Sequence, residues 1–252
     1  MRKVHLTPWW WAVTGGTALV VLAAVDALSP VGAAAGGAYL VVATVLLSRS
    51  LRRGAAARLG PANAVTATRS TLVGIATALV AASFTTAIPV PLLVATAVVA
   101  LSLDALDGPI ARRTGTATAL GARFDMEVDA FLILVLAVYD ARTVGWWVLG
   151  AGMLRYAFVA AAWFWPWMRR TLPARFWRKV VAAAAGIVLT VIAAGLLPPV
   201  AATLLAAAAL ALLVESFGRD VLWLVRMNRT AAGLVSPPRA LRRAGREESS
   251  QT

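Results

Sequence analysis

Long apolar stretches, separated by short polar or proline-containing stretches, follow one another along most of the chain. A helix that crosses a bilayer needs about 20 mostly apolar residues. Prolines in the connections "SP", "IPVP" and "LLPPV" favour helix starts and interrupt helix interiors. The pattern predicts eight membrane helices, of which the fifth is short and partly polar at its start. They lie at approximately 8–28, 31–48, 64–84, 87–106, 126–141, 144–167, 179–197 and 199–217.

The composition supports the same fold class. Sixty per cent of the 252 residues are hydrophobic, which is too high a share for a water-soluble chain. We therefore expect an all-α, polytopic membrane helical bundle. The absence of cysteine excludes disulfides and thiolate metal sites. A basic start precedes the first apolar run, as in a cleavable signal peptide. That run continues to about residue 28 and is long enough to span, so we favour a retained helix.

Positive charge is unevenly placed between the apolar runs. The net charge is +13. Because the basic residues lie in the connections between apolar runs, they favour anionic lipid headgroups over nucleic acid as the partner. Basic residues fill the connections 49–63, 107–125 and 168–179, and seven arginines follow residue 217, whereas the other four connections contain only Arg142. Because cytoplasmic loops of membrane proteins are enriched in Lys and Arg, both termini are predicted to be cytoplasmic.

Acidic residues are few, and they gather in one place. The chain has 11 of them, and five lie within residues 104–129. Asp104 and Asp107 are three positions apart at the predicted end of the fourth helix. Asp125 and Asp129 are four apart at the predicted start of the fifth, so each pair shares one helix face. A short connection makes the two helices antiparallel neighbours, and the pairs are therefore expected to converge on the cytoplasmic side.

Four carboxylates that close repel one another unless a cation lies between them. Hard divalent ions prefer oxygen ligands, so Mg²⁺ or Mn²⁺ is expected, and four carboxylates suffice for two ions. The alternative is that the acids form salt bridges with Arg112, Arg113 and Arg123 of the connection. The regular spacing on facing helix ends favours the metal site. Gly108 and Gly121 allow close approach of a ligand, or merely close helix packing.

The stretch that contains these acids resembles the signature of the CDP-alcohol phosphotransferase (CDP-alcohol phosphatidyltransferase) family. The matching residues are Asp104-x-x-Asp107-Gly108-x-x-Ala111-Arg112, then eight residues, then Gly121-x-x-x-Asp125-x-x-x-Asp129. The resemblance extends over about 61–226, where six predicted helices correspond to the family's six-helix core. It implies three parts: an N-terminal transmembrane hairpin with a basic linker (1–60), the core (61–226) and a basic, disordered tail (227–252).

The resemblance implies an enzyme of phospholipid biosynthesis that displaces CMP from CDP-diacylglycerol with the hydroxyl of a second alcohol. Asp104, Asp107 and Asp125 would ligate a pair of Mg²⁺ or Mn²⁺ ions, and Asp129 would ligate the second ion and act as general base. Homodimers are expected by the same resemblance. The residues that would contact CDP are Gly108, Arg112, Thr118 and Gly121, together with Asn63, Thr66 and Arg69 upstream. Asn63 has an alternative role as the N-cap of its helix.

Two positions near the signature depart from many relatives. Glu127 adds an acid between the third and fourth aspartates, and Ala130 stands where a basic residue is common. Neither position belongs to the signature, so the expected chemistry is unchanged. They weaken any transfer of substrate identity from other members of the family.

Basic residues elsewhere point to the acceptor alcohol. Arg155 lies in the sixth predicted helix, where a charge is costly and normally faces a cavity or a partner. A contact with the acceptor is one explanation, and a salt bridge with Glu215 is the alternative. Arg175, Arg178 and Lys179 lie at the start of the seventh helix, a favourable place for an anion. An acceptor with its own phosphate is expected, either glycerol 3-phosphate or inositol phosphate.

Other acceptors and another class of protein remain as alternatives. A phosphatidylglycerol acceptor would give cardiolipin, and a free alcohol such as serine would use the same chemistry. The acids could also belong to a divalent-cation transporter. Such a transporter would place its acids near the bilayer midplane, whereas these lie at one interface.

Overall fold

A computed structural model describes residues 7–53, 61–114, 119–170, 172–173 and 175–235. Within these ranges, the side chains of residues 7–8, 50–53, 61–63, 106–114, 119–120, 122 and 231–235 are not described. All regular elements in the described ranges are helical, which confirms the predicted all-α bundle.

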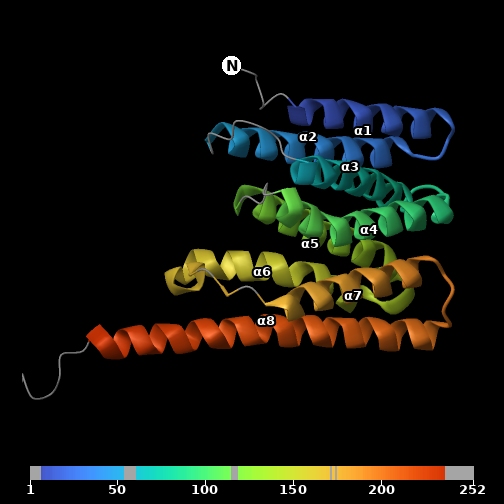
Figure 1. Cartoon of the computed structure of the whole chain (residues 1–252). Helices are drawn as coiled ribbons and strands as arrows, with labels where there is room; N and C mark the ends of the chain where they lie inside the picture. Colours follow the sequence, from blue (N-terminus) through green and yellow to red (C-terminus); the bar gives the residue numbers. More distant parts are fainter. Residues whose placement is uncertain (1–6, 54–60, 115–118, 171, 174, 236–252) are drawn as a thin grey trace, which may run out of the picture.

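Eight α-helices and two short 3-10 helices follow one another through the described part of the chain. Figure 1 shows them side by side in one bundle, with α1 and α2 at one edge and α8 at the opposite edge. The α-helices are α1 (Thr7–Ala24), α2 (Pro30–Arg53), α3 (Pro61–Ala82), α4 (Val90–Thr114), α5 (Ala119–Val144), α6 (Gly150–Phe164), α7 (Phe176–Ala193) and α8 (Pro199–Val235), and the 3-10 helices are η2 (Trp146–Leu149) and η3 (Pro166–Arg169).

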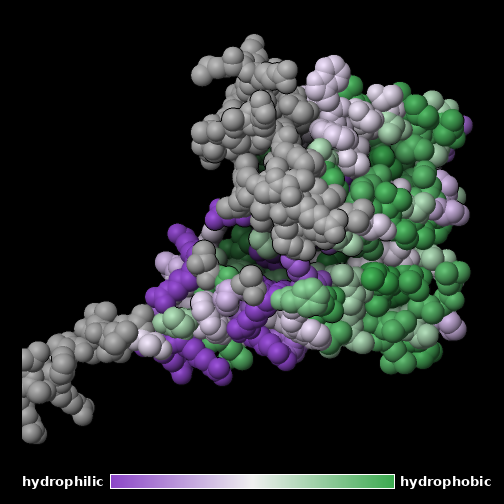
Figure 2. Space-filling view, in the orientation of Figure 1, coloured by the Kyte–Doolittle hydropathy of each residue, from purple (hydrophilic) through white to green (hydrophobic). Residues whose placement is uncertain are grey.

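The surface of the bundle fits a membrane protein. Exposed side chains such as Val20, Val98, Ile187 and Leu204 are apolar. Figure 2 shows hydrophobic residues over much of one face and hydrophilic residues at the end where α8 projects. Five helices of the described part are long and apolar enough to cross a membrane, at Pro30–Arg49, Ala64–Ala82, Trp146–Phe164, Phe176–Ala193 and Pro199–Thr230. The count of eight spans and their direction stay predictions.

Proline and glycine mark several helix ends. Pro30, Pro61 and Pro199 are the first residues of α2, α3 and α8, where the missing N–H of proline costs nothing. Gly145 follows α5 with φ 101° and Gly195 lies just beyond α7 with φ 68°. Glycine adopts these positive φ values without strain and so ends a helix readily.

Several predicted helix ends differ from the structure, and the three largest differences arise because the helices continue beyond their apolar stretches. α4 runs to Thr114 instead of residue 106, and α5 begins at Ala119 instead of residue 126. α8 runs to Val235 instead of residue 217. Its last nine residues belong to the tail that was expected to be disordered, whereas residues 236–252 lie outside the described part. Arginine, leucine and alanine are good helix formers in water as well as in lipid, so a change from apolar to polar residues does not end a helix.

The N-terminal hairpin, α1 with α2, packs closely against α3 through small residues. A Cβ atom built on Gly36 would lie 2.7 Å from the Cβ of Ala78 and 2.8 Å from the carbonyl oxygen of Gly74. Gly32, one turn earlier, would meet the carbonyl oxygen of Ala78 at 2.5 Å. Small residues spaced four apart allow membrane helices to approach this closely. The hairpin is therefore part of the same packed bundle as α3.

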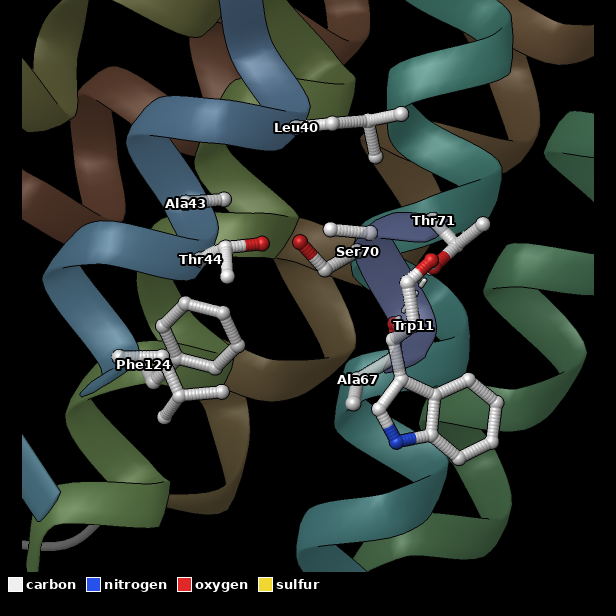
Figure 3. A pocket seen from close by; sticks show the side chains of 10 residues that line it. Trp11, Leu40, Ala43, Thr44, Ala67, Ser70, Thr71 and Phe124 are labelled. Atoms are coloured by element: carbon white, nitrogen blue, oxygen red, sulfur yellow. Dashed lines mark hydrogen bonds between the residues drawn. The ribbon is translucent and has the colours of Figure 1, made fainter. Parts of the chain in front are cut away.

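Figure 3 shows the boundary between the hairpin and α3 from close by, where a small pocket remains. Trp11 of α1 and Leu40 and Thr44 of α2 line it on the hairpin side, and Ser70 of α3 and Phe124 of α5 line it on the other. Ser70 follows Arg69 and Phe124 precedes Asp125 in the sequence, so the pocket lies next to the charged site described below.

Replacing Gly36 by alanine is expected to destabilise the bundle, because the new methyl group meets the backbone of α3. The control is Gly37→Ala, because a Cβ atom built on Gly37 has no neighbour within 4 Å. This control variant gains the helix propensity of alanine without any new steric contact. Overpacking typically costs about 1–3 kcal/mol. Thermal unfolding in detergent should place the Gly36→Ala variant several degrees below Gly37→Ala. Equal stability of the two variants would contradict the close contact between α2 and α3.

Candidate active site

Arg69 of α3 lies at the centre of a buried ionic cluster. Its side chain is 1% exposed, and its Nη1 atom is 3.0 Å from Oδ1 of Asp104 on α4. The same guanidinium forms ion pairs with Asp125 and Asp129 of α5. Its Nε donates a hydrogen bond of 3.2 Å to the carbonyl oxygen of Ala100. One arginine therefore joins three helices and three of the four predicted metal ligands.

The helices bring these carboxylates together as the spacing predicted. Asp125 and Asp129 share one face of α5, and that face meets Asp104 on the antiparallel helix α4. One carboxylate oxygen from each residue lies within 4.8 Å of the others. The acids do not lie in terminal turns, however, because α4 continues to Thr114 and α5 begins at Ala119. The helix dipole acts within the first or last turn of a helix and therefore has little effect on these acids.

Among the described side chains of the cluster, carboxylates outnumber guanidinium groups. Three carboxylates face the guanidinium of Arg69. The aspartates are partly open, with side chains 33%, 25% and 30% exposed for Asp104, Asp125 and Asp129. Accessible carboxylate oxygens that converge in this way are the ligands that Mg²⁺ and Mn²⁺ prefer. The cluster therefore fits a divalent cation.

Several predicted site residues lie wholly or partly outside the described residues. The side chains of Asn63, Asp107 and Arg112 are not described, although their backbone positions and that of Gly108 are helical, and Thr118 is not described at all. Thr66, one turn before Arg69 on α3, is 5% exposed, and Gly121 lies one turn before Asp125 on α5.

Arg155 of α6 forms an ion pair with Glu127 of α5. The alternative partner considered for it, Glu215, was wrong. Glu215 accepts a hydrogen bond of 3.1 Å from Nε1 of Trp177 and pairs with Arg219 on its own helix. Arg155 lies at the depth of the acid cluster, because Glu127 stands between Asp125 and Asp129 in the sequence.

A second basic group surrounds Asp220 of α8. This carboxylate is 3% exposed and lies 3.2 Å from Nη1 of Arg178 and 3.8 Å from Nη1 of Arg175. Arg175 is the N-cap residue of α7 and Arg178 lies in its first turn. Lys179 is exposed and makes no ion pair within the described ranges. Sequence reasoning predicted the arginines but missed Asp220, which lies beyond the predicted end of its helix.

The comparison with known families agrees with the site. The family model of the CDP-alcohol phosphatidyltransferases matches residues 59–215. No curated protein and no solved structure matches the chain. The family match spans more than half of the sequence, and it includes Arg69 and all four aspartates. The chain belongs to the CDP-alcohol phosphatidyltransferase family.

Membership fixes the class of activity. The chain is a membrane-embedded transferase of phospholipid biosynthesis, and its substrates are a CDP-alcohol and an alcohol acceptor. A divalent-cation transporter is therefore not needed to explain the clustered acids.

Replacing Arg69 by glutamine should make the stability of the protein depend on divalent cations. Removing one partner of a buried ion pair costs about 3–5 kcal/mol, and here it would leave three carboxylates without their counter-charge. In EDTA, the Tm of Arg69→Gln should fall well below that of the wild type. Added Mg²⁺ should raise the Tm of the variant more than that of the wild type.

The control for this experiment is Arg219→Gln, which removes an arginine whose side chain is 62% exposed. Its Tm should respond to EDTA and Mg²⁺ as the wild type does. An Arg69→Gln protein with no greater response than Arg219→Gln would show that Arg69 does not offset the charge of these acids.

Proposed function

We propose that the protein transfers a phosphatidyl group from CDP-diacylglycerol to a hydroxyl of a phosphorylated polyol, glycerol 3-phosphate or inositol phosphate, and releases CMP. The observation that carries this proposal is the cluster of Asp104, Asp125 and Asp129, whose carboxylate oxygens lie within 4.8 Å of one another. The cluster lies inside the segment that matches the family.

The four aspartates are proposed as ligands of two Mg²⁺ or Mn²⁺ ions. Asp104, Asp107 and Asp125 would hold the pair, and Asp129 would hold the second ion. When bound, such ions neutralise the diphosphate and the charge that develops on the leaving CMP. The convergence of three partly exposed carboxylates supports this assignment.

Asp129 is also the proposed general base. The acceptor oxygen bonds to the phosphorus of the phosphatidyl group, the bond from that phosphorus to CMP breaks, and the hydroxyl proton passes to the Asp129 carboxylate. The ion pair with Arg69 holds this carboxylate in place, and bound cations would limit its ability to accept a proton. Correct placement of the acceptor hydroxyl must therefore supply much of the rate.

The residues proposed to contact CDP come from α3, α4 and α5 and from the segment between α4 and α5. They are Asn63, Thr66, Gly108, Arg112, Thr118 and Gly121. Arg69 was predicted to join them. Its contacts with the three aspartates support an indirect part instead, in which it positions the acids that face the diphosphate.

The group around Asp220 supports an acceptor that carries a phosphate. Two arginines share one carboxylate there, so a positive charge remains at the N-terminus of α7, where backbone N–H groups also favour an anion. Lys179 adds a further charge. Arg155 contributes less than expected, because Glu127 offsets its charge.

Other acceptors are weaker candidates. Phosphatidylglycerol, which would give cardiolipin, also brings a phosphate to these arginines, whereas a free alcohol would leave them without a ligand.

We further propose that both termini and the site face the cytoplasm, as the charge of the connections predicts, and that the protein forms homodimers as its relatives do.

Replacing Asp129 by asparagine should abolish CMP release, because the amide cannot accept the proton. The assay would use purified protein in detergent with CDP-diacylglycerol and Mg²⁺ or Mn²⁺, and each acceptor would be added singly. Asp26→Asn is the matched control, since Asp26 is exposed and lies in the turn after α1. Full activity of a folded Asp129→Asn protein would refute the proposed base.

Replacing Asp220 by asparagine should raise the KM for a phosphorylated acceptor. The carboxylate holds Arg175 and Arg178 in position, and losing a charge-assisted contact of this kind costs about tenfold in affinity. The KM for CDP-diacylglycerol should not change. Glu215→Gln serves as control on the same helix. If the KM for the acceptor is unaltered in Asp220→Asn, these arginines do not bind the acceptor phosphate.

A further inference from the structure

A cavity of about 470 Å³ lies at the end of the bundle opposite the acid cluster. It is bordered by the start of α4, the end of α5, the end of α7 and the start of α8. Its polar lining comes from Tyr139, Arg142 and Thr143, and its apolar lining includes Ile192, Leu197 and Ala202. Binding sites for small molecules have volumes of about 300–1,000 Å³, so the cavity is large enough to hold a ligand.

The cavity is far from the proposed reaction. Arg142 follows Asp129 by 13 residues on α5, which corresponds to about 20 Å along a helix. A ligand of this cavity is therefore not the CDP-alcohol or the acceptor at the aspartates.

Arg142 is held in a fixed position at this end of the bundle. Its Nη1 donates to the carbonyl oxygen of Ser83 at 2.8 Å, and its Nη2 donates to the Ser83 hydroxyl at 2.6 Å. The guanidinium also lies over the rings of Phe84 and Tyr139, at 4.9 and 5.2 Å from their centroids. These contacts orient the arginine before any ligand binds.

The charge of Arg142 is not offset by an acid. Within the described ranges Arg142 makes no ion pair, and its two hydrogen bonds to Ser83 use only two of its five N–H donors. Thr143 and Tyr139 bring hydroxyl groups to the same cavity. The polar side of the cavity is therefore suited to an anion with several oxygen acceptors, such as a phosphate.

The other side of the cavity is suited to hydrocarbon. Ile192 and Ala202 are buried and line it with apolar surface, and they belong to helices long and apolar enough to cross a membrane. A phosphate next to apolar walls at the edge of a membrane bundle is the chemistry of a phospholipid. A free phosphate ion would use the arginine but not these walls.

We propose that this cavity binds one anionic phospholipid from the leaflet opposite the catalytic site. Its phosphodiester lies on Arg142, with Tyr139 and Thr143 as further donors, and an acyl chain runs along Ile192, Leu197 and Ala202. This lipid is a bound component of the membrane protein and not a substrate.

The test is native mass spectrometry of the full-length protein in detergent, titrated with phosphatidylglycerol. Arg142→Gln removes the phosphate contact, and Ala194→Leu fills the cavity, which Ala194 also lines, without touching the bonds to Ser83. Each variant should weaken binding of one lipid about tenfold. Arg226→Gln removes the same charge from the exposed part of α8 and should bind as the wild type does.

Two further ligands separate the phosphate from the acyl chains. Diacylglycerol, which lacks the phosphate, should not occupy the site, and inorganic phosphate should not displace phosphatidylglycerol. Unchanged binding in Ala194→Leu would overturn the proposal even if Arg142→Gln fails to fold, because that variant keeps the arginine in place. Equal retention of diacylglycerol, or displacement by phosphate alone, would also overturn it.

Discussion

The ionic cluster around Arg69 is the constraint on which the catalytic half of the bundle depends. A buried guanidinium is tolerated only when its charge and its N–H groups have partners. Here the partners are Asp104 on α4 and Asp125 and Asp129 on α5, together with the carbonyl oxygen of Ala100. One side chain therefore joins three helices, and the acids proposed to bind the metal ions are held by the same contacts that stabilise the fold.

The other ionic contacts join the remaining helices in a similar way. Arg155 connects α6 to α5 through Glu127, and Arg178 connects α7 to α8 through Asp220. The Asp220 side chain is 4% exposed, so its pair is costly to break on one side only, whereas the Glu127 side chain is 47% exposed and solvent screens its pair with Arg155. Both ion pairs help to fix the relative positions of the helices they join. In each pair the acid also offsets part of the arginine's charge, and so reduces the charge that a ligand would meet.

The sequence predicted the acids better than their surroundings. Asp125 and Asp129 are spaced one turn apart, so local geometry alone brings them to one face, and the short connection brings α4 beside them. The contacts of Arg69 with these acids were not predicted, because helix periodicity shows which residues share a face but not which helix that face meets. Asp220 was missed for a related reason. The apolar stretch ends at residue 217, whereas α8 continues to Val235. Hydropathy indicates where a helix leaves the membrane, but it does not indicate where the helix ends.

The hairpin formed by α1 and α2 lies outside the family match at residues 59–215, yet it contacts both sides of the ionic cluster. The hydroxyls of Tyr39 and Ser70 share a hydrogen bond of 3.3 Å, and Ser70 follows Arg69. The ring of Tyr39 stacks on Phe131, two residues after Asp129, with centroids 4.7 Å apart. α2 can hold Tyr39 in both contacts because Gly36 and Gly74 bring its backbone close to α3. The hairpin therefore acts as a support for the active-site helices, and its small residues are what allow that support to reach them.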